Sequence, residues 1–172
     1  HVEAARAIAQ AATQAEVKEL VHISALGASS QSASVYARSK AAGEEAVKEA
    51  FEGAVIVRPS AIFGQEDHFF NMFASLARFT PMMPVFGCQP ISSFKFFGLN
   101  TPFGINFYGE GGTRMQPVFV ADVANAIVKI LEINTNSHKM YELGGPKVYG
   151  FKEMMEMVLK ESGRPRILVP FP

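Results

Sequence analysis

Tyr36 and Lys40, four residues apart, are the side chains of this sequence best suited to moving a proton. On a helix, residues at positions i and i+4 share one face, about one turn apart. A free tyrosine titrates near ~10, and a neighbouring ammonium stabilises the phenolate, so such a pair can exchange a proton with a substrate oxygen closer to neutral pH. The spacing therefore predicts an acid–base pair in which the lysine assists the tyrosine.

Ser24 is the third candidate, because it ends the apolar run "VKELVHIS" (17–24), which predicts a strand. Open parallel sheets place their ligands at the carboxyl ends of strands, and a hydroxyl there can hydrogen-bond a substrate carbonyl or alcohol. A tyrosine four before a lysine arises by chance in roughly a third of chains of this length. The strand end upstream favours a site nonetheless, and we predict that Ser24, Tyr36 and Lys40 are catalytic and converge at the carboxyl edge of a sheet.

The elements that must position these residues follow from hydrophobic periodicity, and they alternate between helix and strand along the chain. Such alternation is typical of an α/β fold with a parallel sheet, and the unbroken Val-Ile-Val of the strand "AVIVRPS" indicates burial on both faces. The predicted strands are 17–24, 54–60, a short one near 118 and 139–144. The predicted helices are 2–14, 35–51, 69–79, one capped by Asp122, and one from 151 to a stop at Gly163.

Composition excludes several classes of protein. The chain has 172 residues, 48% of them hydrophobic, which is enough for one sizeable core. Sixteen basic and sixteen acidic residues give no net charge, so no nucleic-acid partner is expected. No secretory signal or membrane span is apparent, and the single Cys88 cannot form an internal disulfide.

No metal site is expected, because the four histidines and Cys88 lack the spacing of metal ligands. His22 lies among apolar neighbours and is interpreted as a core residue rather than a base. Glu66 and Asp67 follow a strand end and could approach a substrate, although a solvated turn is the favoured interpretation.

Three motifs together resemble the extended and atypical branches of the short-chain dehydrogenase/reductase superfamily: "YARSK", "VRPSAIFG" and "VFVADVANAI". The resemblance implies that Tyr36 is the acid–base, that Lys40 holds the nicotinamide ribose and that Ser24 polarises the substrate oxygen. It also implies NADP(H) or NAD(H) as cofactor. The implied cofactor-binding residues are Tyr36, Lys40, Pro59, Ser60 and Ile62.

The same resemblance implies the C-terminal part of a Rossmann-like, doubly wound parallel sheet with a small α/β substrate lobe. Residues 1–172 are then one partial domain, in which 1–64 form the second half of the Rossmann core and 65–172 supply lobe elements interleaved with the last core strand and helix. The superfamily's glycine-rich pyrophosphate turn is expected upstream of His1, so we expect a fragment. "GEGG" (109–112) lacks the strand-turn-helix context and is not expected to replace that turn.

Within the superfamily, "FGQEDHFFNMFASLARF" and the terminal "VPFP" look most like the accessory-subunit branch of mitochondrial complex I. That branch implies a nucleotide held for structure, other complex I subunits as partners, and a location on the matrix side of the inner membrane. Segment 89–114 is interpreted as an insertion, whose aromatic part (94–107) could contact a partner or a membrane surface.

Two alternatives stay open. Bacterial NAD(P)-dependent epimerase/dehydratase-like proteins look similar, and they imply a soluble cytoplasmic enzyme that uses the Ser-Tyr-Lys site. A fold retained only for protein contacts is the other alternative. Whether the site turns over is left open by the sequence.

Overall fold

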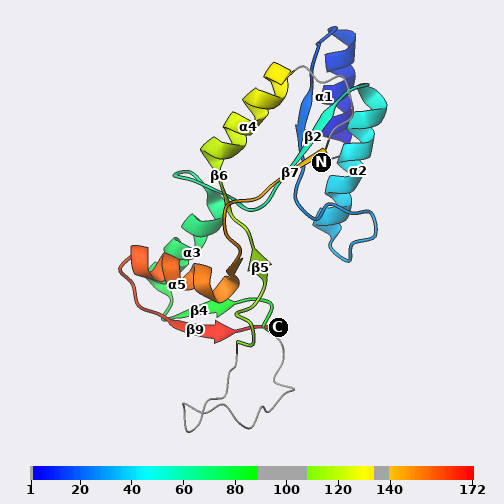
Figure 1. Cartoon of the computed structure of the whole chain (residues 1–172). Coiled ribbons are helices and arrows are strands. Elements are labelled where there is room, and N and C mark those ends of the chain that lie inside the picture. Colours follow the sequence, from blue (N-terminus) through cyan, green and yellow to red (C-terminus); the bar gives the residue numbers. More distant parts are fainter. Residues whose placement is uncertain (1, 89–107, 134–139) are drawn as a thin grey trace. The chain divides into compact units, whose positions relative to one another are not determined.

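The computed structural model describes residues 2–88, 108–133 and 140–172. The chain divides into two compact units, shown in Figure 1. The sheet unit comprises residues 1–62 and 118–146, and the aromatic unit comprises residues 63–117 and 147–172. None of the helices in the described ranges has both the length and the apolar character that crossing a membrane requires.

The sheet unit is built on three parallel strands in the order β1-β2-β7. β1 (Val21–Ile23) and β7 (Met140–Leu143) flank β2 (Val55–Pro59) on either side. Parallel neighbours need crossover connections, and the segment between β1 and β2 supplies one in helix α2 (Val35–Ala50). β2 is therefore the middle strand, and helices can cover both of its faces.

The alternation of side chains along β2 divides the core of the sheet unit into two layers. Ile56 is fully buried and packs with residues of α1 (Val2–Gln14) and α2. Val55 and Val57 point to the opposite face and pack with α4 (Val120–Ile133). In Figure 1, α1 and α2 lie beside each other, with the strands between them and α4. The predicted doubly wound α/β fold is confirmed.

The aromatic unit packs α3 (His68–Phe79) against α5 (Phe151–Glu161). Rings meet edge to face in its core, with centroids 5.2 Å apart for Phe69 and Phe73 and 5.6 Å apart for Phe73 and Phe151. The core is completed by small and flexible apolar side chains. Its buried members are Phe73, Ala77, Met83, Val85, Cys88, Phe151, Met154, Met155 and Leu159.

Short strands complete the fold. β4 (Met82–Val85) pairs in parallel with β9 (Ile167–Pro170), and β5 (Arg114–Met115) pairs antiparallel with β8 (Tyr149–Gly150). A further pair consists of β3 (Ile62–Phe63) and β6 (Val118–Phe119).

All five predicted helices are present, and their ends agree with the sequence to within a residue or two, except at α4. That helix begins at Val120, so Asp122 lies in its first turn and is not the predicted N-cap. A carboxylate there still stabilises the helix by interacting with its dipole. Asp67, for which the sequence favours a solvated turn, caps α3 by accepting a hydrogen bond of 2.6 Å from the Phe70 amide. Most of the predicted insertion (89–107) lies outside the described residues.

The two methionines at 154 and 157 of α5 offer a matched test of the aromatic core. Met154 is fully buried, whereas Met157 is 39% exposed. We expect Met154→Ala to lower the free energy of unfolding by about 2–5 kcal/mol, because it removes a buried side chain and leaves a cavity. Met157→Ala should change it by less than ~1 kcal/mol. Urea unfolding measures both values, and equal losses in the two variants would contradict the packing described.

Candidate functional site

Helix α2 presents Tyr36 and Lys40 on its first two turns. The helix begins after Ser34, whose hydroxyl accepts a hydrogen bond of 3.4 Å from the Ala37 amide. The Lys40 ammonium lies 5.8 Å from the centre of the Tyr36 ring, within cation–π range. Tyr36 is 58% exposed. The structure therefore brings the predicted acid–base pair together, on the end of the helix that follows the carboxyl end of β1.

Among the described residues, the Tyr36 hydroxyl and the Lys40 ammonium form no hydrogen bond or ion pair. Both groups are hydrogen-bond donors, and Tyr36 is exposed while Lys40 is partly exposed. A hydroxyl and an ammonium one turn apart fit the hydroxyl groups of a nicotinamide ribose. The chemistry of the donor set is thus compatible with the cofactor that the sequence predicts.

Ser24 lies at the predicted strand end. Its amide donates a 2.7 Å hydrogen bond to the Val57 carbonyl, and the Ser60 amide donates one of 2.8 Å to the Leu143 carbonyl. Both serines thus follow strands at the same carboxyl edge of the sheet. The Ser24 side chain, however, is only 3% exposed, and it lies next to Glu44 of α2. Its hydroxyl oxygen has no hydrogen-bond partner of standard geometry among the described residues.

The other predicted cofactor contacts share this edge. Pro59 is the last residue of β2 and is buried, Ser60 follows it, and Ile62 begins β3. Ser60 and Ile62 are both partly exposed. Contacts of these residues with a cofactor, and the catalytic role of Ser24, stay predictions.

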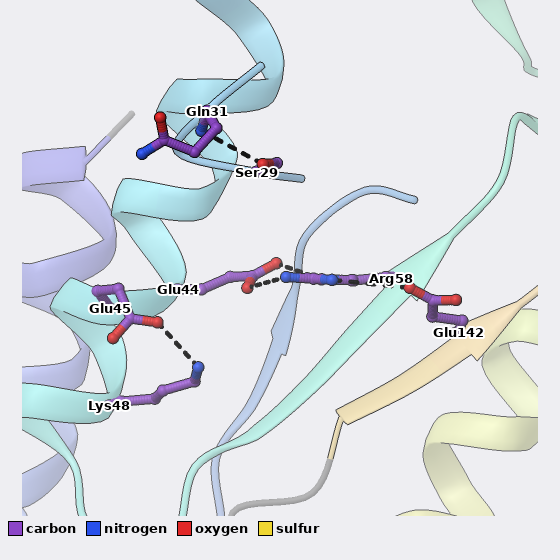
Figure 2. A network of polar contacts seen from close by, with 7 residues as sticks. All are labelled: Ser29, Gln31, Glu44, Glu45, Lys48, Arg58 and Glu142. Atoms are coloured by element: carbon purple, nitrogen blue, oxygen red, sulfur yellow. Dashed lines mark hydrogen bonds and ion pairs between the residues drawn. The ribbon is translucent and has the colours of Figure 1, made fainter. Parts of the chain in front are cut away.

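A buried ion pair next to the predicted trio was missed by the sequence analysis. Arg58 of β2 donates two hydrogen bonds to the Glu44 carboxylate, from Nε to Oε1 at 2.8 Å and from Nη2 to Oε2 at 2.7 Å. Its Nη1 also lies 3.6 Å from Oε1 of Glu142 on β7. Figure 2 shows the guanidinium between the two carboxylates. The Glu44 side chain is only 2% exposed, and that of Arg58 is 17% exposed.

Two signals in the sequence could have revealed this pair. Arg58 interrupts an otherwise apolar buried strand, and a buried charge needs a partner of opposite sign. Glu44 follows Lys40 by four residues, so it lies on the same face of α2 as the acid–base pair.

The electrostatics of Glu44 follow from these contacts. Burial alone would raise the pKa of its carboxyl group, because it disfavours the charged form. The hydrogen bonds from Arg58, the neighbouring Ser24 hydroxyl, and the charges of Arg58 and Lys48 together outweigh burial and lower the pKa. The hydrogen bond to Glu44 in turn raises the pKa of Arg58. Both partners are therefore charged at neutral pH.

His22 of β1 lies under the same helix. Its Nε2 is 3.8 Å from where a Cβ on Gly43 would stand, so a side chain at that position would be in van der Waals contact with the imidazole. Burial and the positive charge of Lys40 lower the pKa of His22, and the negative charge of Glu44 partly opposes them. His22 is thus a partly buried residue whose pKa depends on the charges of Lys40 and Glu44 on α2.

The glycine run 109–112 has a structural explanation within the aromatic unit. Gly109, Gly111 and Gly112 adopt positive φ angles, and a Cβ on Gly112 would collide with the backbone oxygen of Phe86. The run therefore permits a tight turn against neighbouring backbone. No group of three or more potential metal ligands occurs within the described ranges.

A parallel sheet covered on both faces, with a Tyr-x-x-x-Lys pair on the helix after its first strand, defines an α/β fold of the short-chain dehydrogenase/reductase type. The chain belongs to the RmlD substrate-binding domain family, whose sequence pattern matches residues 1–89.

Known proteins support this assignment. The mitochondrial NADH dehydrogenase [ubiquinone] 1 alpha subcomplex subunit 9 of Mus musculus is 35% identical over 167 residues, which are 97% of this chain and 38% of that protein. Ceramide reductase of Caulobacter vibrioides is 43% identical over 83 residues, or 48% of this chain and 26% of that protein. The structure of dTDP-4-dehydrorhamnose reductase from Bacillus anthracis, in complex with NADP, superposes with a TM-score of 0.68 at 20% identity, covering 99% of this chain and 56% of that one.

The pKa of His22 tests the placement of Lys40. We expect an NMR titration of the His22 ring to give a midpoint below the ordinary value of about 6.5, because burial and the Lys40 charge disfavour the imidazolium. Lys40→Met should raise that midpoint. Since the pKa of His22 is lower in the folded state than in the unfolded state, its protonation also removes stability as the pH falls through about 6.5. A midpoint unaffected by Lys40→Met would show that the two side chains are far apart.

Proposed function

We propose that the protein is a nicotinamide-nucleotide-binding accessory subunit of respiratory complex I, in which the nucleotide is held for structure and assembly. The observation that carries the proposal is the 35% identity to the mouse subunit along 97% of this chain. The chain spans about two fifths of the length of that relative, so the activity and partners of the whole protein are part of the proposal.

Tyr36 and Lys40 are the residues that would hold the nucleotide, with Pro59, Ser60 and Ile62 lining the strand ends nearby. The Lys40 ammonium would donate hydrogen bonds to the ribose hydroxyls, and the Tyr36 hydroxyl would be available to the nicotinamide end of the nucleotide. When bound, a nicotinamide nucleotide supplies hydride transfer. In the role proposed here that chemistry is not used, and binding instead stabilises the fold by mass action.

Other complex I subunits are the proposed partners, on the matrix side of the inner membrane. The aromatic unit exposes large apolar side chains at Phe79 and Ile167, with 83% and 67% of their surface accessible. Exposed apolar groups of this size are common at protein interfaces. Segment 94–107, for which a contact with a partner or a membrane surface is also proposed, lies outside the described residues.

A soluble reductase or epimerase is the second candidate function. It is favoured by the similarity to ceramide reductase over 83 residues and by the uncommitted Tyr36 and Lys40 side chains. In that role, Tyr36 exchanges the proton of the substrate oxygen while Lys40 holds the cofactor.

Tyr36→Phe and Lys40→Met in the full-length protein distinguish the two functions. We expect the protein to co-migrate with the respiratory complex on native gels of fractionated mitochondria. Tyr36→Phe should leave assembly and respiration intact, because the proposed role needs no proton transfer and Lys40 still holds the nucleotide when the phenol hydroxyl is lost. Lys40→Met should weaken the nucleotide affinity by about tenfold, which corresponds to one charge-assisted hydrogen bond of about 1.5 kcal/mol. The enzyme function would be favoured instead if an unassembled, soluble protein lost an NADPH-dependent reduction with Tyr36→Phe.

A further inference from the structure

The ion pair between Glu44 and Arg58 is the one directional contact described between helix α2 and the strand β2. Two parallel hydrogen bonds of 2.8 and 2.7 Å fix the plane of the carboxylate as well as its distance from the guanidinium. Glu142 of β7 approaches the same guanidinium at 3.6 Å. The orientation of α2 is therefore tied to the two strands at the centre and edge of the sheet.

Other contacts of α2 with the sheet involve small or apolar side chains of the helix. Gly43 faces His22 of β1, while Ala46 and Val47 are buried with 1% exposure each. Apolar contacts between small side chains are not directional, so they tolerate small rotations and translations of a helix. A bidentate ion pair does not tolerate such movements of the helix, because its hydrogen bonds weaken steeply as they bend.

The position of Glu44 on the helix connects this pair to the candidate site. Tyr36, Lys40 and Glu44 are spaced by four residues, so they follow one another along a single face. A helix rises ~1.5 Å per residue, which places Glu44 about 6 Å from Lys40 and about 12 Å from Tyr36 along the axis. A rotation or shift of α2 at Glu44 would therefore be carried directly to the acid–base pair.

We propose that Glu44 and Arg58 are positioning residues: they fix the rotation and the axial position of α2 so that Tyr36 and Lys40 stand correctly at the carboxyl edge of the sheet. The proposal rests on the proposed function in that the nucleotide is taken to be held by these two side chains. Glu44 and Arg58 are assigned no contact with the ligand in this proposal and act through the placement of α2.

Net stabilisation is a weak explanation for such a pair. Removing two charges from water is costly, and replacing a buried ion pair by apolar residues of similar volume is often neutral or stabilising. The exposed pair Arg6–Glu49, which joins α1 to the same helix at 3.0 Å, provides a control with 38% and 64% of its side chains accessible. It links α2 to a helix rather than to the sheet.

The test compares two double variants of the full-length protein, Glu44→Met with Arg58→Met, and Arg6→Met with Glu49→Met. Each removes one positive and one negative charge, so neither alters the net attraction of a phosphate group. We expect the buried variant to keep the melting temperature of the wild type and to bind NADPH at least tenfold more weakly. The exposed control should bind NADPH within about twofold of the wild type, because exposed pairs contribute little.

Arg58→Lys provides a second variant, which retains the charge but not the two-pronged geometry. It should also bind NADPH more weakly, by about threefold or more. If the double-methionine variant fails to fold, Arg58→Lys decides the matter. The proposal would be overturned if the double-methionine variant folds and binds NADPH with wild-type affinity. If only Arg58→Lys folds, wild-type affinity for NADPH in that variant would overturn it.

Amide hydrogen exchange separates this inference from the proposed function. If the wild-type full-length protein does not bind NADPH, the proposed function fails, and the positioning claim is then judged from exchange in segment 35–40 at the start of α2. Faster exchange there in the buried double variant, but not in the exposed control, supports positioning by the ion pair. Unchanged exchange overturns it.

Discussion

The carboxylate of Glu44 is almost completely buried, and the fold around it is constrained by the need to pair that charge. A buried charge without a partner is costly, and one that is paired and hydrogen-bonded is tolerated. Arg58 meets this need because β2 is the middle strand and its guanidinium reaches α2 on one side and Glu142 on the other. This ion pair therefore connects α2 to β2 at one point, and the apolar side chains of the two layers pack around it.

The candidate site has a buried part, which includes the paired Glu44, and an exposed part. Ser24 and Glu44 are buried, while Tyr36 on the same helix is 58% exposed. Ligand binding is favoured when the accessible donors, Tyr36 and Lys40, stand on a helix that the buried residues hold in place. Preorganised groups lose little entropy when a ligand binds. A nucleotide held mainly for assembly and a nucleotide used in turnover would both be served by this arrangement.

Local patterns made most of the fold predictable from the sequence. The helices carry apolar residues at helical spacing, and β2 is a continuous apolar run, so both are encoded within a few residues. The pairing of Met82–Val85 with Ile167–Pro170 was not predictable, because it joins short segments that are far apart in the chain. The Tyr36–Lys40 pair was found from its spacing together with the strand end that precedes it. Glu44 was missed because a glutamate on a helix is usually a solvated residue, and its burial depends on the tertiary fold.

A double-mutant cycle on Glu44 and Arg58 tests the central claim most directly. The free energy of unfolding is measured for the wild type, for Glu44→Gln, for Arg58→Met and for the combination of both. If the pair is the buried contact described here, each single variant leaves a buried polar group without its partner and loses about 3–5 kcal/mol, and the double variant loses far less than the sum. Single losses that add to within about 0.5 kcal/mol would show that the two side chains do not interact, and would contradict the account.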